Sequence, residues 1–251
     1  MFQDSGVTLR MLLKRTSFSA MLIALLFLLL ISPTIRVSTA HFESTSRPVG
    51  SQTVVPVGRF SSVELRNGGK VFVRHGATQR VTLLKGSLVY TQITIAGGDQ
   101  LVINKCRSKC PRGYELEVEV VAPDIAEISI ADGGTIEVRG NFPSREEVRV
   151  AVSQGGTIDI RSLKVDSVTA SVNQGGEIFT KPQSAMVASV RQGGNITYWG
   201  EVQVRSSVQQ GGVIIKGTPD EADKPLSDFD ALQPVPPTPP LPVQPVRNLF
   251  R

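Results

Sequence analysis

The stretch "AVSQGGTIDI" (residues 151–160) returns at near-constant intervals as "SVNQGGEIFT" (171–180), "SVRQGGNITY" (189–198) and "SVQQGGVIIK" (207–216). On both sides of each Gly-Gly pair, apolar and mostly β-branched residues alternate with polar ones. That alternation predicts two β-strands, each with one buried face. The glycines predict a tight turn between the strands, at a point that needs positive φ or close backbone approach.

Aligning the repeats on the second glycine of each pair produces columns of like residues. The glycines themselves are Gly134, Gly156, Gly176, Gly194 and Gly212, at spacings of 22, 20, 18 and 18 residues. Two positions after them stand Ile136, Ile158, Ile178, Ile196 and Ile214; two positions before the last four stand Gln154, Gln174, Gln192 and Gln210. Strands repeating at this period predict an all-β fold, specifically a single-stranded β-solenoid, or β-helix, with like side chains stacked about 4.8 Å apart. We interpret both columns as structural ladders, with the isoleucines in the core and the glutamine amides hydrogen-bonded to one another.

The predicted solenoid domain covers residues 53–217, and its N-terminal part is less regular. The segment "VELRNGGKVFV" (63–73) fits the repeat frame, whereas "QITIAGGDQLVI" (92–103) is slipped by one residue and is typical of a hairpin. We therefore expect residues 53–121 to be an irregular, β-rich start to the solenoid.

The two ends of the chain differ in composition from this domain. Basic residues followed by the apolar run "MLIALLFLLLI" (21–31) and the small residues before His41 are typical of a secretory signal, here residues 1–40. An uncleaved membrane anchor is the alternative, although the run is shorter than the roughly 20 residues of a spanning helix. Residues 41–52 are expected to be flexible. Residues 218–251 are acidic at first and then carry seven prolines between Pro234 and Pro245, which predicts a disordered tail.

Charge and cysteine content argue against two classes of function, nucleic-acid binding and metal binding. The net charge is +5, but four cations and one acid of the first 40 residues account for +3 of it. The remaining charge is too small and too scattered for a nucleic-acid binder. Cys106 and Cys110 are the two cysteines, and in an oxidising compartment we expect them to form a disulfide. The spacing C-x₃-C with no second ligand pair argues against a metal site, and no cofactor is expected.

Three segments resemble the GIN-domain family of bacterial proteins, described as head domains of autotransporter adhesins. They are "VPVGRFSSVELRNGGKVFV" (55–73), "LVINK" (101–105) and "VEVVAPDIAEISIADGGTIEV" (118–138). The resemblance extends over about residues 54–217, although turns in the family more often have the sequence Gly-Ser-Gly. It implies an exported β-helix, right-handed where known, without an established activity.

Candidate site residues lie on the outward columns of the repeats. Glu137 and Asp159 fall on neighbouring repeats, as a pair of glycosidase carboxylates would, but nearby arginines suggest solvated ion pairs. We therefore predict no catalytic residues. Phe179, Lys181 and Trp199 are the candidate binding residues, with the alternative that the tryptophan shields the core.

The sequence thus predicts an exported, non-enzymatic envelope or surface protein with a binding, adhesin-like or scaffolding role. Its expected partners are glycans or envelope proteins, with no nucleic acid and no membrane span after signal cleavage. A polysaccharide-active enzyme and a solenoid that assembles end to end are the alternatives.

Overall fold

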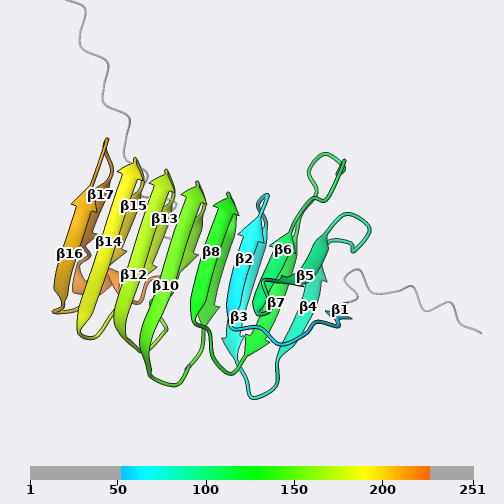
Figure 1. Cartoon of the computed structure of the whole chain (residues 1–251), viewed down its shortest axis with the longest axis horizontal. Helices are drawn as coiled ribbons and strands as arrows, with labels where there is room; N and C mark the ends of the chain where they lie inside the picture. Colours follow the sequence, from blue (N-terminus) through cyan, green and yellow to red (C-terminus); the bar gives the residue numbers. More distant parts are fainter. Residues whose placement is uncertain (1–51, 227–251) are drawn as a thin grey trace, which may run out of the picture. The chain divides into compact units, whose positions relative to one another are not determined.

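The computed structural model describes residues 52–226, which fold into two β-sheets of mostly parallel strands (Figure 1). The signal segment 1–40, the expected flexible segment 41–52 apart from its last residue, and the proline-rich part of the tail lie outside the described residues. Within the described part of the chain, no helix is long and apolar enough to cross a membrane.

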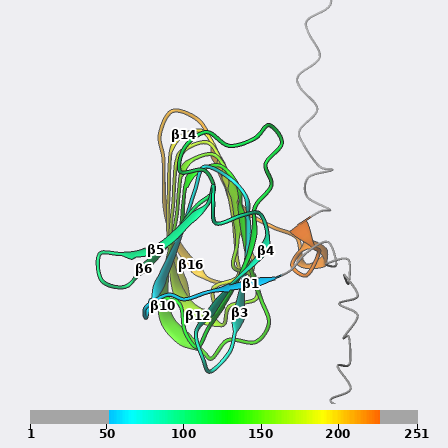
Figure 2. The same cartoon turned by 90° about the vertical axis from the view of Figure 1, so that its right-hand side faces the viewer.

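The nine-stranded sheet contains one strand from every repeat. In spatial order it consists of β1 (Thr53–Val55), β4 (Arg80–Lys85), β7 (Glu117–Ala122), β3 (Lys70–His75), β9 (Thr135–Arg139), β11 (Thr157–Asp159), β13 (Glu177–Thr180), β15 (Asn195–Tyr198) and β17 (Val213–Lys216). The eight-stranded sheet consists of β16 (Gln203–Val208), β14 (Ala185–Gln192), β12 (Val165–Gln174), β10 (Arg145–Gln154), β8 (Glu127–Asp132), β2 (Ser62–Arg66), β6 (Gln100–Asn104) and β5 (Gln92–Ala96). The two sheets face each other across one apolar core (Figure 2).

The all-β class is as expected, but the predicted single-stranded β-solenoid is wrong. Each repeat contributes two strands, one to each sheet, and both sheets are mixed. The pairs β1–β4, β4–β7 and β5–β6 are antiparallel. In the N-terminal half, moreover, spatial order departs from chain order: β3 lies between β7 and β9, and β2 lies between β6 and β8. A period in the sequence identifies which side chains point inward, but it does not identify the neighbouring strand.

Within the C-terminal repeats, the register places like residues beside one another. Ile158 is the Cα partner of both Ile136 and Ile178, and Ile196 is the partner of Ile178 and Ile214. The first four isoleucines are fully buried, and Ile214 is partly buried at the last repeat. Pairing in register therefore builds the core from a row of β-branched side chains that pack on their equivalents in the next strand.

The glutamine column lies on the exposed surface beside the turns. Gln174 is the Cα partner of Gln154 and Gln192, and its amide Nε2 donates a hydrogen bond of 3.2 Å to Oε1 of Gln192. Gln210 lies beyond the end of β16 with a positive φ of 54°. These amides are solvent-exposed, so any single hydrogen bond between them contributes little to stability.

The second glycine of each turn is required by close packing. At Gly176 φ is +104°, and an added Cβ would lie 2.8 Å from the carbonyl oxygen of Gly156 and 2.6 Å from Cγ1 of Val152. The preceding Gly175 also has positive φ, but no atom lies within 4 Å of its added Cβ. The repeated Gly-Gly therefore combines a turn requirement with the contact between neighbouring turns.

Candidate binding surface on the nine-stranded sheet

The outer face of the nine-stranded sheet carries the outward columns of the repeats. One column, three positions after the second glycine, contains Glu137, Asp159 and Phe179. The next outward column, five positions after the second glycine, contains Arg139 at the end of β9 and Arg161, Lys181 and Trp199 just beyond the ends of β11, β13 and β15. Since side chains alternate along a strand, these residues point away from the isoleucine core.

A segment after the last strand crosses this face, and we call residues 218–226 the strap. It begins with a short 3-10 helix, η1 (Pro219–Glu221), and lies on the outer side of the nine-stranded sheet (Figure 2). This part of the predicted tail is therefore ordered against the sheet, in contrast to the expected disorder. Ala222 is buried, and Leu226 packs against the same small apolar cluster as Phe179 and Trp199.

Trp199 anchors the beginning of the strap. Its indole Nε1 donates a hydrogen bond of 2.8 Å to the carbonyl oxygen of Thr218, and only 2% of the residue is exposed. Gly217 passes directly over the indole, since a Cβ there would lie 2.3 Å from Cε2 of Trp199. The indole thus has both its apolar ring and its polar nitrogen satisfied by the strap, as a buried tryptophan requires.

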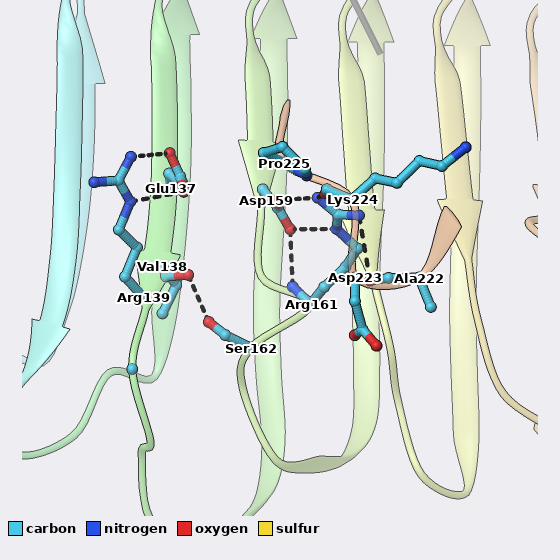
Figure 3. Close-up of a pocket in the computed structure, with 11 residues that line it drawn as sticks. Glu137, Val138, Arg139, Asp159, Arg161, Ser162, Ala222, Asp223, Lys224 and Pro225 are labelled. Atoms are coloured by element: carbon cyan, nitrogen blue, oxygen red, sulfur yellow. Dashed lines mark hydrogen bonds and ion pairs between the residues drawn. The ribbon is translucent and has the colours of Figure 1, made fainter. Parts of the chain in front are cut away.

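Arg161 anchors the middle of the strap. Its guanidinium donates hydrogen bonds to the carbonyl oxygens of Glu221, Ala222 and Lys224, at 3.0, 3.3 and 2.7 Å. It also donates to both carboxylate oxygens of Asp159, at 3.0 and 2.6 Å, which holds the guanidinium in one orientation (Figure 3). Both side chains are less than 10% exposed. A buried, bidentate pair of this kind positions its donors rigidly.

Beside the strap lies a pocket of about 300 Å³, lined by β9, β11 and the strap itself (Figure 3). Glu137 occupies its rim, where Nε and Nη2 of Arg139 donate hydrogen bonds of 2.7 Å to the two carboxylate oxygens. These hydrogen bonds raise the pKa of the Arg139 guanidinium above its ordinary value. The same guanidinium lies 4.1 Å from the ring centroid of Phe72, a cation–π contact. A second pocket of about 260 Å³ joins these residues to Lys70 and to Pro225 and Leu226 of the strap.

The structure brings the three predicted binding residues together, but two of them are covered. The rings of Phe179 and Trp199 lie 6.2 Å apart, and both residues are at most 5% exposed beneath the strap. The Lys181 side chain is 44% exposed, and its Nζ lies 3.6 Å from a carboxylate oxygen of Asp223. Phe179 and Trp199 therefore pack under the strap, in a small cluster separate from the main core.

The two cysteines are joined in a disulfide in the loop between β6 and β7. Within the described part of the chain, no group of His, Cys, Asp or Glu side chains is arranged to hold a metal ion.

Sequence reasoning missed two features. The first was the strap, because acidic and proline-containing sequence usually indicates disorder. The available indication of an ordered turn into the strap was Gly217, which directly follows the last strand of the repeats. The other was the basic loop around the disulfide, where "KCRSKCPR" places four cations within residues 105–112.

These features define an all-β repeat module whose candidate site lies on a sheet face. The chain matches the family model described as "Putative auto-transporter adhesin, head GIN domain" over residues 59–146 and 144–201. This match covers more than half of the 251 residues. The chain belongs to the GIN-domain family, and the resemblance noted in the sequence is confirmed.

Several solved structures are similar to the chain. A "putative adhesin" from Bacteroides fragilis is 14% identical, covers 68% of this chain and 98% of its own, and has a TM-score of 0.46. A "putative lipid binding protein" from Parabacteroides distasonis is 11% identical, with coverages of 67% and 97% and a TM-score of 0.38. A "putative cell adhesion protein" from Clostridium sporogenes is 11% identical, with coverages of 67% and 100% and a TM-score of 0.37. No curated protein matches the sequence.

Proposed function

We propose that this chain is a non-catalytic, adhesin-like binding module that is exported to the periplasm or the cell surface. Membership of the GIN-domain family is the observation that carries the proposal. The signal-like segment 1–40 and the disulfide support export, because disulfides persist in oxidising compartments. The expected partners are glycans or other envelope proteins.

The state of the two outward carboxylates supports a binding role over polysaccharide cleavage. Glycosidases need one carboxyl group to donate a proton and a second to act as nucleophile or base. Asp159 is held by Arg161, and Glu137 is held by Arg139, each through two hydrogen bonds. Both oxygens of each carboxylate are therefore already engaged by an arginine of the same chain.

We place the ligand on the two pockets beside the strap. Their lining combines the Phe72 ring, the cations Lys70 and Arg139, and the Glu137 carboxylate. An aromatic ring among charged hydrogen-bonding groups suits a polar ligand such as a glycan, which stacks an apolar face and hydrogen-bonds its hydroxyls. A ligand that instead contacts Phe179, Trp199 and Lys181 must displace the strap.

A glycan array and an envelope pull-down with the full chain test the proposal. Lys70→Ala with Phe72→Ala should weaken capture of the ligand at least tenfold without unfolding the chain, since both residues are on the outer surface. Arg191→Ala on the opposite sheet is the matched control and should leave binding unchanged. Removing residues 218–251 distinguishes the two faces, because tighter binding after removal would assign the ligand to Phe179, Trp199 and Lys181.

An enzymatic role has a separate test. Incubation with envelope and extracellular polysaccharides should release no shorter products. Cleavage of any polysaccharide that disappears in the Glu137→Gln, Asp159→Asn double variant would overturn the proposal.

A further inference from the structure

Two loops at the N-terminal end of the sheets are joined into one projection. We call it the basic knob, and it comprises residues 86–91 between β4 and β5 and residues 105–114 between β6 and β7 (Figure 1). The backbone N–H of Arg107 donates a hydrogen bond of 2.9 Å to the carbonyl oxygen of Tyr90. The Tyr114 hydroxyl lies 2.7 Å from both the Ser87 nitrogen and the buried Thr91 hydroxyl. The two loops therefore form one fixed surface.

The first loop of the knob presents two adjacent apolar side chains to solvent. Leu88 is 47% exposed and Val89 is 79% exposed, the largest exposure of any large apolar residue between residues 52 and 226. The turn beneath them is closed by hydrogen bonds from the backbone N–H groups of Tyr90 and Thr91 to the carbonyl oxygen of Ser87. The fixed turn thus holds an aliphatic pair at its tip, which costs hydration free energy unless a partner covers it.

The second loop adds positive charge to the knob. It carries Lys105, Arg107, Lys109 and Arg112 within eight residues. Within the part of the chain that the structure describes, none of the four forms a salt bridge. The nearby Glu115 pairs instead with Lys85, and that hydrogen bond lowers the pKa of the Glu115 carboxyl. The Cys106–Cys110 disulfide closes the loop and keeps its cations together.

We propose that the basic knob docks on the surface of an anionic phospholipid bilayer. Leu88 and Val89 enter the boundary between headgroups and acyl chains, and the cations of the second loop lie on lipid phosphates. Clustered Lys and Arg residues are attracted to anionic lipid, and exposed aliphatic residues gain from burial in the interfacial layer. An anionic polymer such as a nucleic acid or acidic polysaccharide would satisfy the cations, but it offers no apolar layer to the aliphatic tip.

Co-sedimentation of the full chain with lipid vesicles tests this interface. Vesicles of equal parts phosphatidylglycerol and phosphatidylcholine should bind the chain more tightly than pure phosphatidylcholine, and the preference should fall as salt rises from about 0.05 M to about 0.5 M. Arg107→Ser with Lys109→Ser should weaken binding to the anionic vesicles about 30-fold, since each cation near such a surface contributes about a fivefold factor. Leu88→Ser with Val89→Ser should weaken it about tenfold or more.

Lys164→Ser with Arg191→Ser is the matched control, because it removes the same charge from exposed positions outside the knob. The apolar run 21–31 is present in every variant, so the differences between variants report the knob alone. Circular dichroism checks that each variant is folded. Equal binding by the knob and control variants, or no preference for anionic vesicles, would overturn the proposal. Full competition by dextran sulfate, with the Leu88, Val89 variant binding normally, would identify a polyanion site instead and would also overturn it.

Discussion

Ile178 shows how the repeats stabilise the core one residue at a time. It is fully buried, and its neighbours in the adjacent strands are Ile158 and Ile196. Ile178→Ala should lower the free energy of unfolding by about 2–5 kcal/mol, because a large-to-small change leaves a cavity between them. Urea denaturation followed by circular dichroism measures the loss. A change below about 1 kcal/mol would mean that the isoleucine row does not carry the packing.

For Thr180, two residues further along the same strand, we expect that substitution does not lower the stability. It is fully buried, and its hydroxyl has no hydrogen-bond partner among residues 52–226. A buried polar atom without a partner costs about 1–3 kcal/mol. Thr180→Val keeps the shape and removes the hydroxyl oxygen, so it should leave the melting temperature unchanged or raise it. A marked fall would imply a partner for that hydroxyl.

The two glycines of one turn should respond differently to substitution. Gly175→Ala places a Cβ in open space and costs only the left-handed backbone conformation, about 1–2 kcal/mol. Gly176→Ala adds a collision with the Gly156 carbonyl and should cost clearly more. Thermal unfolding of the two single variants measures the difference. Equal melting temperatures would contradict the close packing of neighbouring turns.

Among the structural elements, we expect the strap to stabilise the nine-stranded sheet. It covers Trp199 and supplies three carbonyl acceptors to Arg161. Truncation after Gly217 should lower stability by about 1.5–3 kcal/mol, the effect of exposing one large apolar side chain. Truncation after Leu226 keeps the strap and serves as the control. If both truncations unfold at the same temperature, the strap does not stabilise the sheet.

The strand pairings of the two sheets also show which features the sequence could predict and which it could not. The isoleucine and glutamine columns follow from repeats that pair with the next copy in the chain, so their alignment is visible as a spacing of 18 to 22 residues. The pairing of β3 with β9 joins segments 65 residues apart, with the five strands β4 to β8 between them in the chain. No local period encodes such a partner. The candidate site has the same limit, because Trp199 and Arg161 become buried only when the strap folds back across the sheet.

For the molecule as a whole, the proposed export predicts the N-terminus, the compartment and the redox state of the mature chain. The mature chain should begin at His41, lie outside the cytoplasm and contain the Cys106–Cys110 disulfide. Cell fractionation, N-terminal sequencing and thiol alkylation measure these three properties. A full-length cytoplasmic chain with two free thiols would contradict the proposed compartment.

The equal spacing of the last three glycine turns has an evolutionary consequence. Each 18-residue unit adds one strand to each sheet, in the same register as its predecessor. An in-frame duplication of one unit would therefore lengthen both sheets by about 4.8 Å with the same turn and core contacts, while moving Arg161 one strand further from the start of the strap. The length of the two sheets can thus change in steps of one strand, while each added unit keeps the same turn and the same core contacts.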